Sequence, residues 1–342
     1  MDNKRSLYIH AGFPKCASSS IQQAIYKNLK LLNQKGIFPL GSDLKIASKE
    51  NMGIPLWPIE KLKQQHNNEG AVLSILRECS KVSSDGDLVV TAENLSDVRA
   101  PNLFFEADKE YNVKIVFYLK PQFEYISSAW KQWALKNGLE LTRFSNDCMR
   151  LGRPSYREIL FAWKQSLPKA TISVRPLVKN HLHGENPSSD FLVFLGCHLD
   201  ATRISNKHFN TSWDYSILHV LMRGHDQFFS GIHDNEFTEN LESALTEKAK
   251  KINIDLFNFD SKMKIENCFR KENKSIIKEF CTVDDVDTLY NSYFVPRETG
   301  KVSYLELEEK DIAARCIDIL MTCPSTQEVE LLKKVARFLM EK

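Results

Sequence analysis

The sequence lacks a strong excess of charge of either sign. Among its 342 residues, 46 Lys and Arg stand against 44 Asp and Glu, which gives a formal net charge of +2. A protein that binds nucleic acid through a broad basic surface has a clear positive excess, so we expect no nucleic-acid partner. Any site for an anion must instead be local, built from a few cations and backbone N–H groups.

Long apolar runs are missing as well. No stretch of the sequence approaches the ~20 apolar residues that a membrane-spanning helix needs. The first apolar run, residues 7–9, is far shorter than the apolar region of a secretory signal, and His10, Gly12 and Lys15 follow it closely. We therefore expect a cytoplasmic protein without a membrane span.

Closely spaced cysteines are also absent. The eight cysteines are scattered and none forms a CxxC pair, which argues against a zinc site or a disulfide framework and favours reduced thiols. His181 and His183 lie one residue apart, but two histidines in a loop are more often surface residues than metal ligands. The sequence predicts no metal.

Short apolar runs alternate with helical patterns over the first two thirds of the chain. This alternation predicts an α/β fold with a parallel sheet. The predicted strands are residues 7–9, 88–91, 113–119 and 170–174, and the predicted helices include about 21–32, 70–82, 122–136, 156–166 and the segment around 191–195. Residues 41–70 look irregular, and from about residue 214 the pattern becomes mainly helical and highly charged.

The segment after the first predicted strand has the composition of an anion-binding loop. A glycine-containing turn at a helix N-terminus aims free N–H groups at one point, and the helix dipole adds positive charge there. Lys15 supplies a full charge, and Ser18, Ser19 and Ser20 supply hydroxyl groups. Pro14 stands where the Walker pattern has glycine, so this is not a standard nucleotide-triphosphate loop. The alternative is an ordinary turn with a surface lysine and serines that cap a helix.

The string Gly-Phe-Pro-Lys-Cys-Ala-Ser-Ser-Ser-Ile-Gln, residues 12–22, resembles the 5′-phosphosulfate loop of sulfotransferases that use 3′-phosphoadenosine 5′-phosphosulfate (PAPS). The bacterial members are the most similar. Cys16 and Ala17 depart from that pattern, because Thr and Gly are commoner there. The resemblance implies a P-loop-like three-layer fold with helices on both faces of the sheet. It also implies that the donor is bound by Gly12, Pro14, Lys15, Cys16, Ala17, Ser18, Ser19 and Ser20.

A second motif follows the predicted strand 113–119. Lys120 stands at the carboxyl end of this strand, on the ligand side of an α/β sheet, and Ser128 follows about two helical turns later. The pair resembles the 3′-phosphate site of the same family, in which Arg is usual at the first position. An alignment shifted by one residue would choose Ser127, and a plain helix N-terminus with solvated serines is the alternative.

Two more residues stand at predicted strand ends. Glu93 follows the strand 88–91, where a carboxylate near Lys15 could accept a proton from an acceptor hydroxyl. The family has a general base at this place, so the resemblance implies that role for Glu93; a salt-bridged surface Glu is the alternative. Arg175 resembles part of a family V-R-P segment, and contact with the donor or a structural ion pair are equal alternatives.

The resemblance covers about residues 6–282, which predicts one α/β domain over 1–282 and a mainly helical extension over 283–342. It implies transfer of a sulfuryl group from PAPS to a hydroxyl or amine of a carbohydrate, glycolipid or small molecule. Lys15 would stabilise the leaving phosphate, Glu93 would act as base, and adenosine 3′,5′-bisphosphate would be the product. A small-molecule kinase and a non-catalytic binder of nucleotides or glycans are the rival hypotheses.

Overall fold

The computed structural model describes residues 4–83, 86–197, 213–247, 249, 254–281 and 285–341. The chain divides into two compact units. We call the first, residues 1–120, 155–207 and 271–293, the α/β unit. We call the second, residues 121–154, 208–270 and 294–342, the helical unit. This division follows packing in space, so it does not coincide with the predicted division along the sequence at residue 282.

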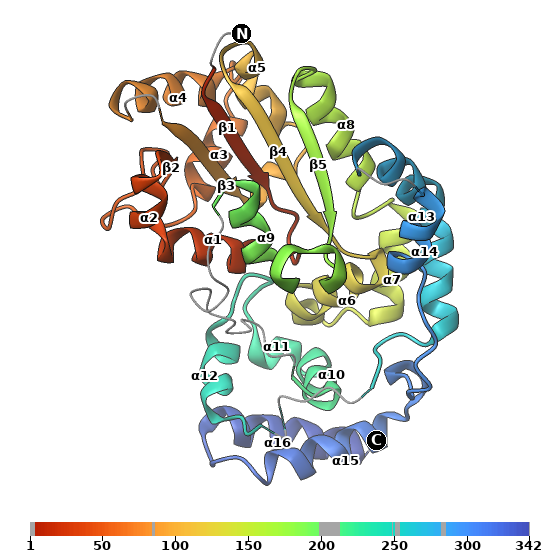
Figure 1. Cartoon of the computed structure of the whole chain (residues 1–342). Helices are drawn as coiled ribbons and strands as arrows, with labels where there is room; N and C mark the ends of the chain where they lie inside the picture. Colours follow the sequence, from red (N-terminus) through yellow and green to blue (C-terminus); the bar gives the residue numbers. More distant parts are fainter. Residues whose placement is uncertain are drawn as a thin grey trace. The chain divides into compact units, whose positions relative to one another are not determined.

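A five-stranded sheet forms the centre of the α/β unit, and all its strand pairs are parallel (Figure 1). The strands are β1 (Ser6–Ala11), β2 (Ile37–Pro39), β3 (Asp87–Ala92), β4 (Asn112–Leu119) and β5 (Thr171–Pro176). Their order in the sheet is β2-β3-β1-β4-β5. The predicted parallel sheet is therefore confirmed, with the short edge strand β2 as an addition.

Most helices of this unit lie in the connections between strands, and α9 and α14 follow the last strand. They are α1 (Ser18–Lys27), α2 (Leu29–Gln34), α3 (Leu56–Lys63), α4 (Ala71–Val82), α5 (Ala107–Glu110), α8 (Tyr156–Ser166), α9 (Pro187–Phe194) and α14 (Val286–Tyr293). The prediction of one helix after the first loop was wrong in detail, because the chain breaks at Asn28 into α1 and α2. Residues 41–70 were predicted to be irregular but contain α3, which starts after Pro55.

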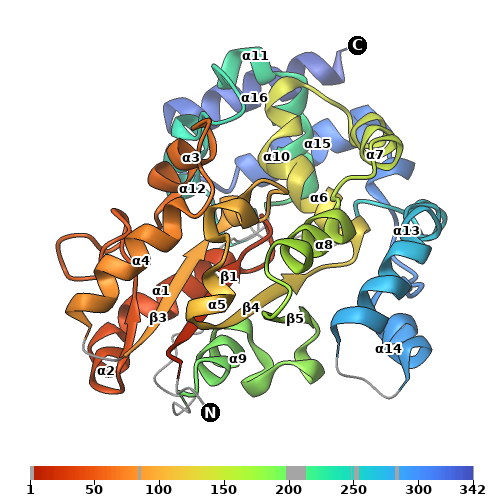
Figure 2. The same cartoon turned by 90° about the horizontal axis from the view of Figure 1, so that it is seen from above.

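Helices cover both faces of the sheet, as predicted (Figure 2). On one face, Phe194 of α9 packs edge-on against Tyr8 of β1, with ring centroids 5.5 Å apart. On the other face, Trp163 of α8 packs against Phe117 of β4 at 6.4 Å. Because central parallel strands are buried on both faces, their side chains are apolar in nearly every position. This explains the continuous apolar run of β4, which is buried from Ile115 to Leu119.

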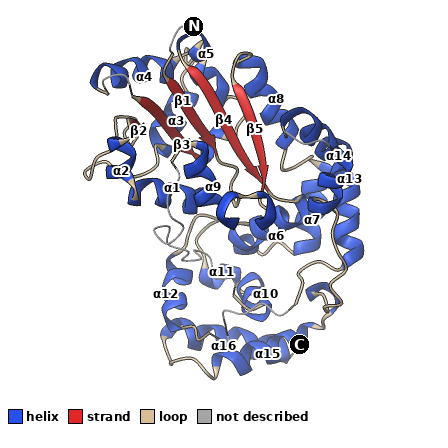
Figure 3. Cartoon of the chain, in the orientation of Figure 1, coloured by secondary structure: helices blue, strands red, loops and turns tan. Residues whose placement is uncertain are grey.

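The strands all belong to the α/β unit, and helices build the other unit (Figure 3). The helices are α6 (Gln122–Gln132), α7 (Leu141–Arg150), α10 (Tyr215–Arg223), α11 (His225–Phe228), α12 (Glu236–Ala244), α15 (Glu309–Leu320) and α16 (Gln327–Met340). A further helix, α13 (Phe259–Phe280), begins in this unit and ends in the α/β unit. The apolar core includes fully buried Trp130, Ile217, Ile319 and Leu332. The helical character predicted after residue 214 is confirmed.

Across the residues that the structure describes, we find no helix with the length and apolar character to cross a membrane. All eight cysteines are free thiols, and five of them are buried.

Candidate functional site

The strand order places a topological switch point at the carboxyl ends of β1 and β4. The chain leaves β1 toward β2 on one side of the sheet and leaves β4 toward β5 on the other. Ligands of open α/β sheets bind where neighbouring strands diverge in this way. The Lys15 loop follows β1, Lys120 follows β4, and Glu93 follows β3, the other neighbour of β1. Three predicted site residues therefore follow three adjacent strands.

The loop after β1 is a tight turn with two residues in the left-handed region. Lys15 has φ 64° and Ala17 has φ 67°, conformations that cost a non-glycine residue roughly 1–2 kcal/mol each. The Cys16 N–H donates to the Phe13 carbonyl at 3.1 Å, which closes the turn. Ala17 is the position where glycine is commoner in the resembling loop. The backbone thus keeps a conformation suited to glycine although the glycine is missing.

Gly12 is required by a close approach. A Cβ atom at this position would lie 2.6 Å from Ser18 Oγ and 3.1 Å from His10 Cε1. The Ser18 hydroxyl donates to the Phe13 carbonyl at 3.2 Å, so the first helical serine is folded back onto the loop. Any larger residue at position 12 would separate the loop from the start of α1.

The first turn of α1 offers N–H groups to a ligand. Ala17 caps the helix without a side-chain hydrogen bond. In the described part of the chain, the N–H groups of Ser18, Ser19 and Ser20 donate to no backbone carbonyl. The first turn carries no acidic residue, so no carboxylate of α1 itself opposes the positive end of the helix dipole. Such a helix start suits an anion.

His10, at the end of β1, packs beneath the loop with its ring uncharged. Its side chain is completely buried, and this burial lowers the pKa of His10 to about 3. Its Nδ1 lies 2.8 Å from Thr91 Oγ1 of β3, and its ring packs against Phe191 at 5.4 Å. These contacts tie the end of β1 to its neighbour strand and to α9, so we assign His10 a structural role.

Lys15 interacts electrostatically with both Lys120 and Glu93. Burial lowers the pKa of Lys15, the charge of Lys120 lowers it further, and Glu93 opposes both. Burial likewise raises the pKa of Glu93, against the charge of Lys15 and the hydroxyl of Ser18. Two lysines that repel each other beside a helix start are stabilised when an anion binds between them and the helix. This arrangement therefore favours the binding of an anion.

A tyrosine that the sequence analysis missed joins two of these segments. The Tyr156 hydroxyl, at the start of α8, donates to the Lys120 carbonyl at 3.2 Å. Its ring is buried and lies edge-on against Phe13 of the loop, with centroids 4.6 Å apart. Tyr156 therefore fixes the backbone at Lys120 relative to the Lys15 loop. Nothing in the local sequence indicates this contact, because it joins residues far apart in the chain.

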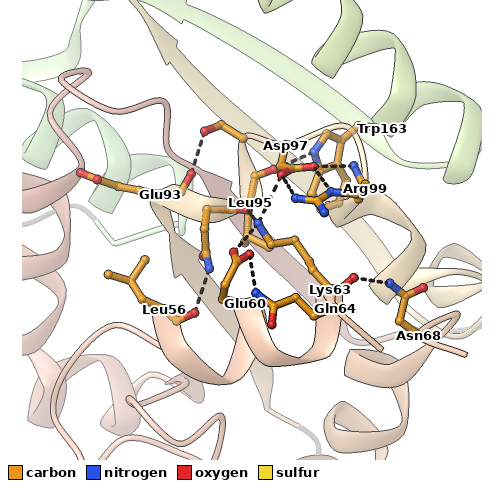
Figure 4. Close-up of polar contacts among 12 residues, drawn as sticks. Leu56, Glu60, Lys63, Gln64, Asn68, Glu93, Leu95, Asp97, Arg99 and Trp163 are labelled. Carbon is orange, nitrogen blue, oxygen red and sulfur yellow. Dashed lines mark hydrogen bonds and ion pairs between the residues drawn. The ribbon is translucent and has the colours of Figure 1, made fainter. Parts of the chain in front are cut away.

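The segment that carries Glu93 is held by a buried lysine (Figure 4). Lys63 of α3, whose side chain is only 3% exposed, pairs with Glu60 at 2.7 Å and Asp97 at 3.4 Å. Its ammonium group also donates to the Asn94 carbonyl at 3.2 Å. A buried charge with this many partners keeps α3 fixed against the turn at 93–97.

Glu93 itself takes no part in that network through its carboxylate. Figure 4 shows its side chain pointing away from Lys63, Asp97 and Arg99, while its backbone carbonyl accepts from the Ser96 hydroxyl at 2.7 Å. The neighbouring Asn94 amide donates to the Leu56 carbonyl at 2.8 Å. These bonds anchor the backbone around Glu93, while its carboxylate interacts with Lys15 instead.

Arg175 has a structural partner. Its Nη1 lies 2.6 Å from Oδ2 of Asp190, a carboxylate only 4% exposed. The same oxygen accepts from the Tyr118 hydroxyl at 2.7 Å, and Oδ1 accepts from the His183 N–H at 3.0 Å. Of the two alternatives for Arg175, the ion pair is present in the structure, and contact with the donor stays a prediction.

Ser128 lies on α6 in the helical unit and is half-buried. The Ser127 hydroxyl donates to the Phe123 carbonyl at 2.8 Å, whereas the Ser128 hydroxyl has no hydrogen-bond partner among the described residues. This difference favours Ser128 over Ser127 as the serine that is open to a ligand. Residues 210–212, an Asn-Thr-Ser string that resembles a further segment of the same family, lie outside the residues that the structure describes.

The remaining features are the burial of the tryptophans and the arrangement of possible metal ligands. Trp130 and Trp163 are fully buried, whereas Trp57 on α3 is 84% exposed. Within the described ranges, no three His, Cys, Asp or Glu side chains gather as a metal site.

The chain matches no model of a known protein family and no curated protein. The class that fold and site define is therefore an α/β protein with a parallel sheet and a lysine-bearing loop at the end of its central strand.

Proposed function

We propose that the protein is a PAPS-dependent sulfotransferase with a P-loop-like fold. The observation that carries the proposal is the grouping of Lys15, Lys120 and Glu93 beside the open N–H groups of α1. Two cations and a helix start match a donor with a phosphate at each end of its ribose. The carboxylate beside them matches an acceptor that has to lose a proton.

The residues divide the chemistry between them. Lys15 and the N–H groups of Ser18, Ser19 and Ser20 hold the 5′-phosphate and neutralise the charge that develops on its bridging oxygen. Lys120 holds the 3′-phosphate, and the assignment of Ser128 to the same phosphate stays a prediction from the sequence. Glu93 takes the proton of the acceptor as the new bond to sulfur forms and the bond to the phosphate oxygen breaks. A carboxyl group whose pKa is raised by burial is a better base than an ordinary Glu.

The sheet supports the P-loop-like assignment. The loop leaves the carboxyl end of β1, the middle strand, and runs into α1, which is the strand–loop–helix order of a phosphate-binding loop. The acceptor in this proposal is a carbohydrate, glycolipid or small molecule with a hydroxyl or amine. We keep the cytoplasm as its place of action, in keeping with the eight free cysteines.

Thermal unfolding with nucleotides tests the donor. Adenosine 3′,5′-bisphosphate should raise the melting temperature by several degrees, since a ligand at a hundredfold excess over its Kd adds roughly 2.7 kcal/mol of stability. ATP and ADP should have smaller effects. Lys15→Ala should abolish the shift, and Lys30→Ala, which removes an exposed lysine of α2, should keep it. A larger shift with ATP would favour the kinase, and no shift with any nucleotide would reject the donor site.

A further inference from the structure

A cavity in the helical unit has the composition of a second ligand site. Its volume is about 310 Å³, at the lower end of the range for small-molecule pockets. It is lined from the start of α7, from α10 and from the segment that runs into α15. None of its lining residues belongs to the predicted donor site.

One side of this cavity is apolar. Leu141, Met222 and Ile312 are buried at its wall, and Leu305 and Leu307 line it while remaining partly exposed. Such a wall can accept the hydrocarbon part of a ligand and release the water that covers it. The site thus suits a molecule with a compact apolar body.

The other side is a preorganised polar network. His219 lies with Nδ1 2.7 Å from the Tyr304 hydroxyl and with Nε2 3.2 Å from Glu309. Arg223 pairs with Glu309 at 2.6 Å and approaches Glu140 at 3.6 Å. Because these side chains hold one another in place, a ligand would meet them with little reordering.

The charges of the network determine whether the cavity favours a cationic or an anionic ligand. Burial lowers the pKa of His219, so its ring is neutral near pH 7. Two carboxylates then face one guanidinium, which leaves an excess of one negative charge at the cavity. Arg223 is already shared between both carboxylates, and Glu140 is 65% exposed and held only at 3.6 Å. An anion would compete with both carboxylates for Arg223, whereas a cation would find Glu140 still able to accept hydrogen bonds.

We infer that this cavity binds a small organic ammonium ion, with the apolar body against Leu141 and Met222 and the charged nitrogen at Glu140 and Glu309. The inference does not depend on the proposed sulfotransferase function. It rests on the cavity and its charges, and it would stand if the nucleotide tests failed.

Calorimetric titration of the full chain with two probes tests it. Phenethylammonium and 3-phenylpropanoate have similar apolar bodies and opposite charges. We expect saturable binding of the ammonium probe, about tenfold tighter than the carboxylate. Equal or tighter binding of the carboxylate, or no binding of phenethylammonium at millimolar concentration, would overturn the inference.

Paired variants locate the binding. Thr142 lines the cavity and is exposed, and its neighbour Arg143 is exposed but does not line it. Thr142→Trp should fill the mouth and abolish binding of phenethylammonium, whereas Arg143→Trp should leave it. Glu140→Gln should weaken the binding of phenethylammonium severalfold and leave the binding of a neutral probe, benzyl alcohol, unchanged. This variant serves as the test if Thr142→Trp does not fold. Unchanged binding in Thr142→Trp or Glu140→Gln would place the probe elsewhere and refute the site.

Discussion

Lys15 and Glu93 lie at the ends of two adjacent strands, and each charge stabilises the charged form of the other. Burial acts in the opposite direction on both, so the pKa of Glu93 is raised and that of Lys15 is lowered. If Glu93 is the base, sulfuryl transfer should fall at low pH along a limb that lies above the ordinary Glu pKa. Lys15→Ala should move this limb to still higher pH, because the variant removes the charge that opposes burial.

The measurement is the pH profile of residual transfer, supported by NMR titration of the Glu93 carboxyl in both proteins. An acid limb that stays in place in Lys15→Ala would contradict the electrostatic contact, and an acid limb that persists in Glu93→Gln would contradict the role as base.

Glu93 should also lower the stability of the fold. A carboxyl whose pKa is raised by folding stabilises the folded state at pH values below its unfolded pKa, and this contribution is lost as pH rises through the folded pKa. Glu93→Gln should therefore raise the urea midpoint at pH 7, with a smaller gain at pH 4, while it abolishes most transfer. Glu60→Gln is the matched control, because Lys63 lowers the pKa of Glu60 and the sign should reverse. A loss of stability in Glu93→Gln at pH 7 would refute the prediction.

Much of the sheet could be predicted because central parallel strands leave a clear apolar pattern. The runs at 88–91 and 113–119 lie within β3 and β4. The edge strand β2 has only three residues, too few for a pattern, and α3 was hidden by Pro55 and Pro58. Pro58 is tolerated there because the N–H groups in the first turn of a helix have no intrahelical acceptor, so the N–H that proline lacks is not missed.

The candidate site was less predictable. Residue types at strand ends indicated Lys15, Glu93 and Lys120, since their places follow from the pattern of strands. The partner of Arg175 and the bridge through Tyr156 depend on contacts between distant segments. A single sequence carries no local signal for such contacts.

Ala17→Gly should stabilise the protein. Ala17 has a left-handed backbone, which glycine adopts without strain, so we expect a gain of up to about 1 kcal/mol in the free energy of unfolding. Ala24→Gly in the middle of α1 is the control and should cost at least about 1 kcal/mol. Chemical denaturation of the two variants and the parent decides the matter. Equal losses in both variants would show that the loop does not hold Ala17 in this conformation.

Lys120→Arg should tighten the binding of adenosine 3′,5′-bisphosphate. A guanidinium can give a phosphate two parallel hydrogen bonds where an ammonium acts as a point charge. One additional bond of about 1 kcal/mol corresponds to roughly a fivefold lower Kd. Lys114→Arg, on β4 itself, is the control and should leave the Kd unchanged, because the Lys114 ammonium lies over the Tyr8 ring, 5.1 Å from its centroid. Calorimetry that shows weaker binding in Lys120→Arg would argue against a phosphate at this position.

Arg175→Met should affect the fold more than the donor. The change leaves Asp190 buried without its cation, and breaking a buried pair from one side costs about 3 kcal/mol. Arg150→Met breaks an exposed pair with Asp147 and should cost less than about 1 kcal/mol. The double variant Arg175→Met with Asp190→Asn should recover part of the loss, because no buried charge is then left alone.

Urea unfolding measures these differences, and calorimetry measures the Kd for adenosine 3′,5′-bisphosphate, which we expect to stay within about twofold. A tenfold weaker Kd with unchanged stability would instead make Arg175 a ligand of the donor, and the ion pair with Asp190 would be a resting arrangement that the nucleotide displaces.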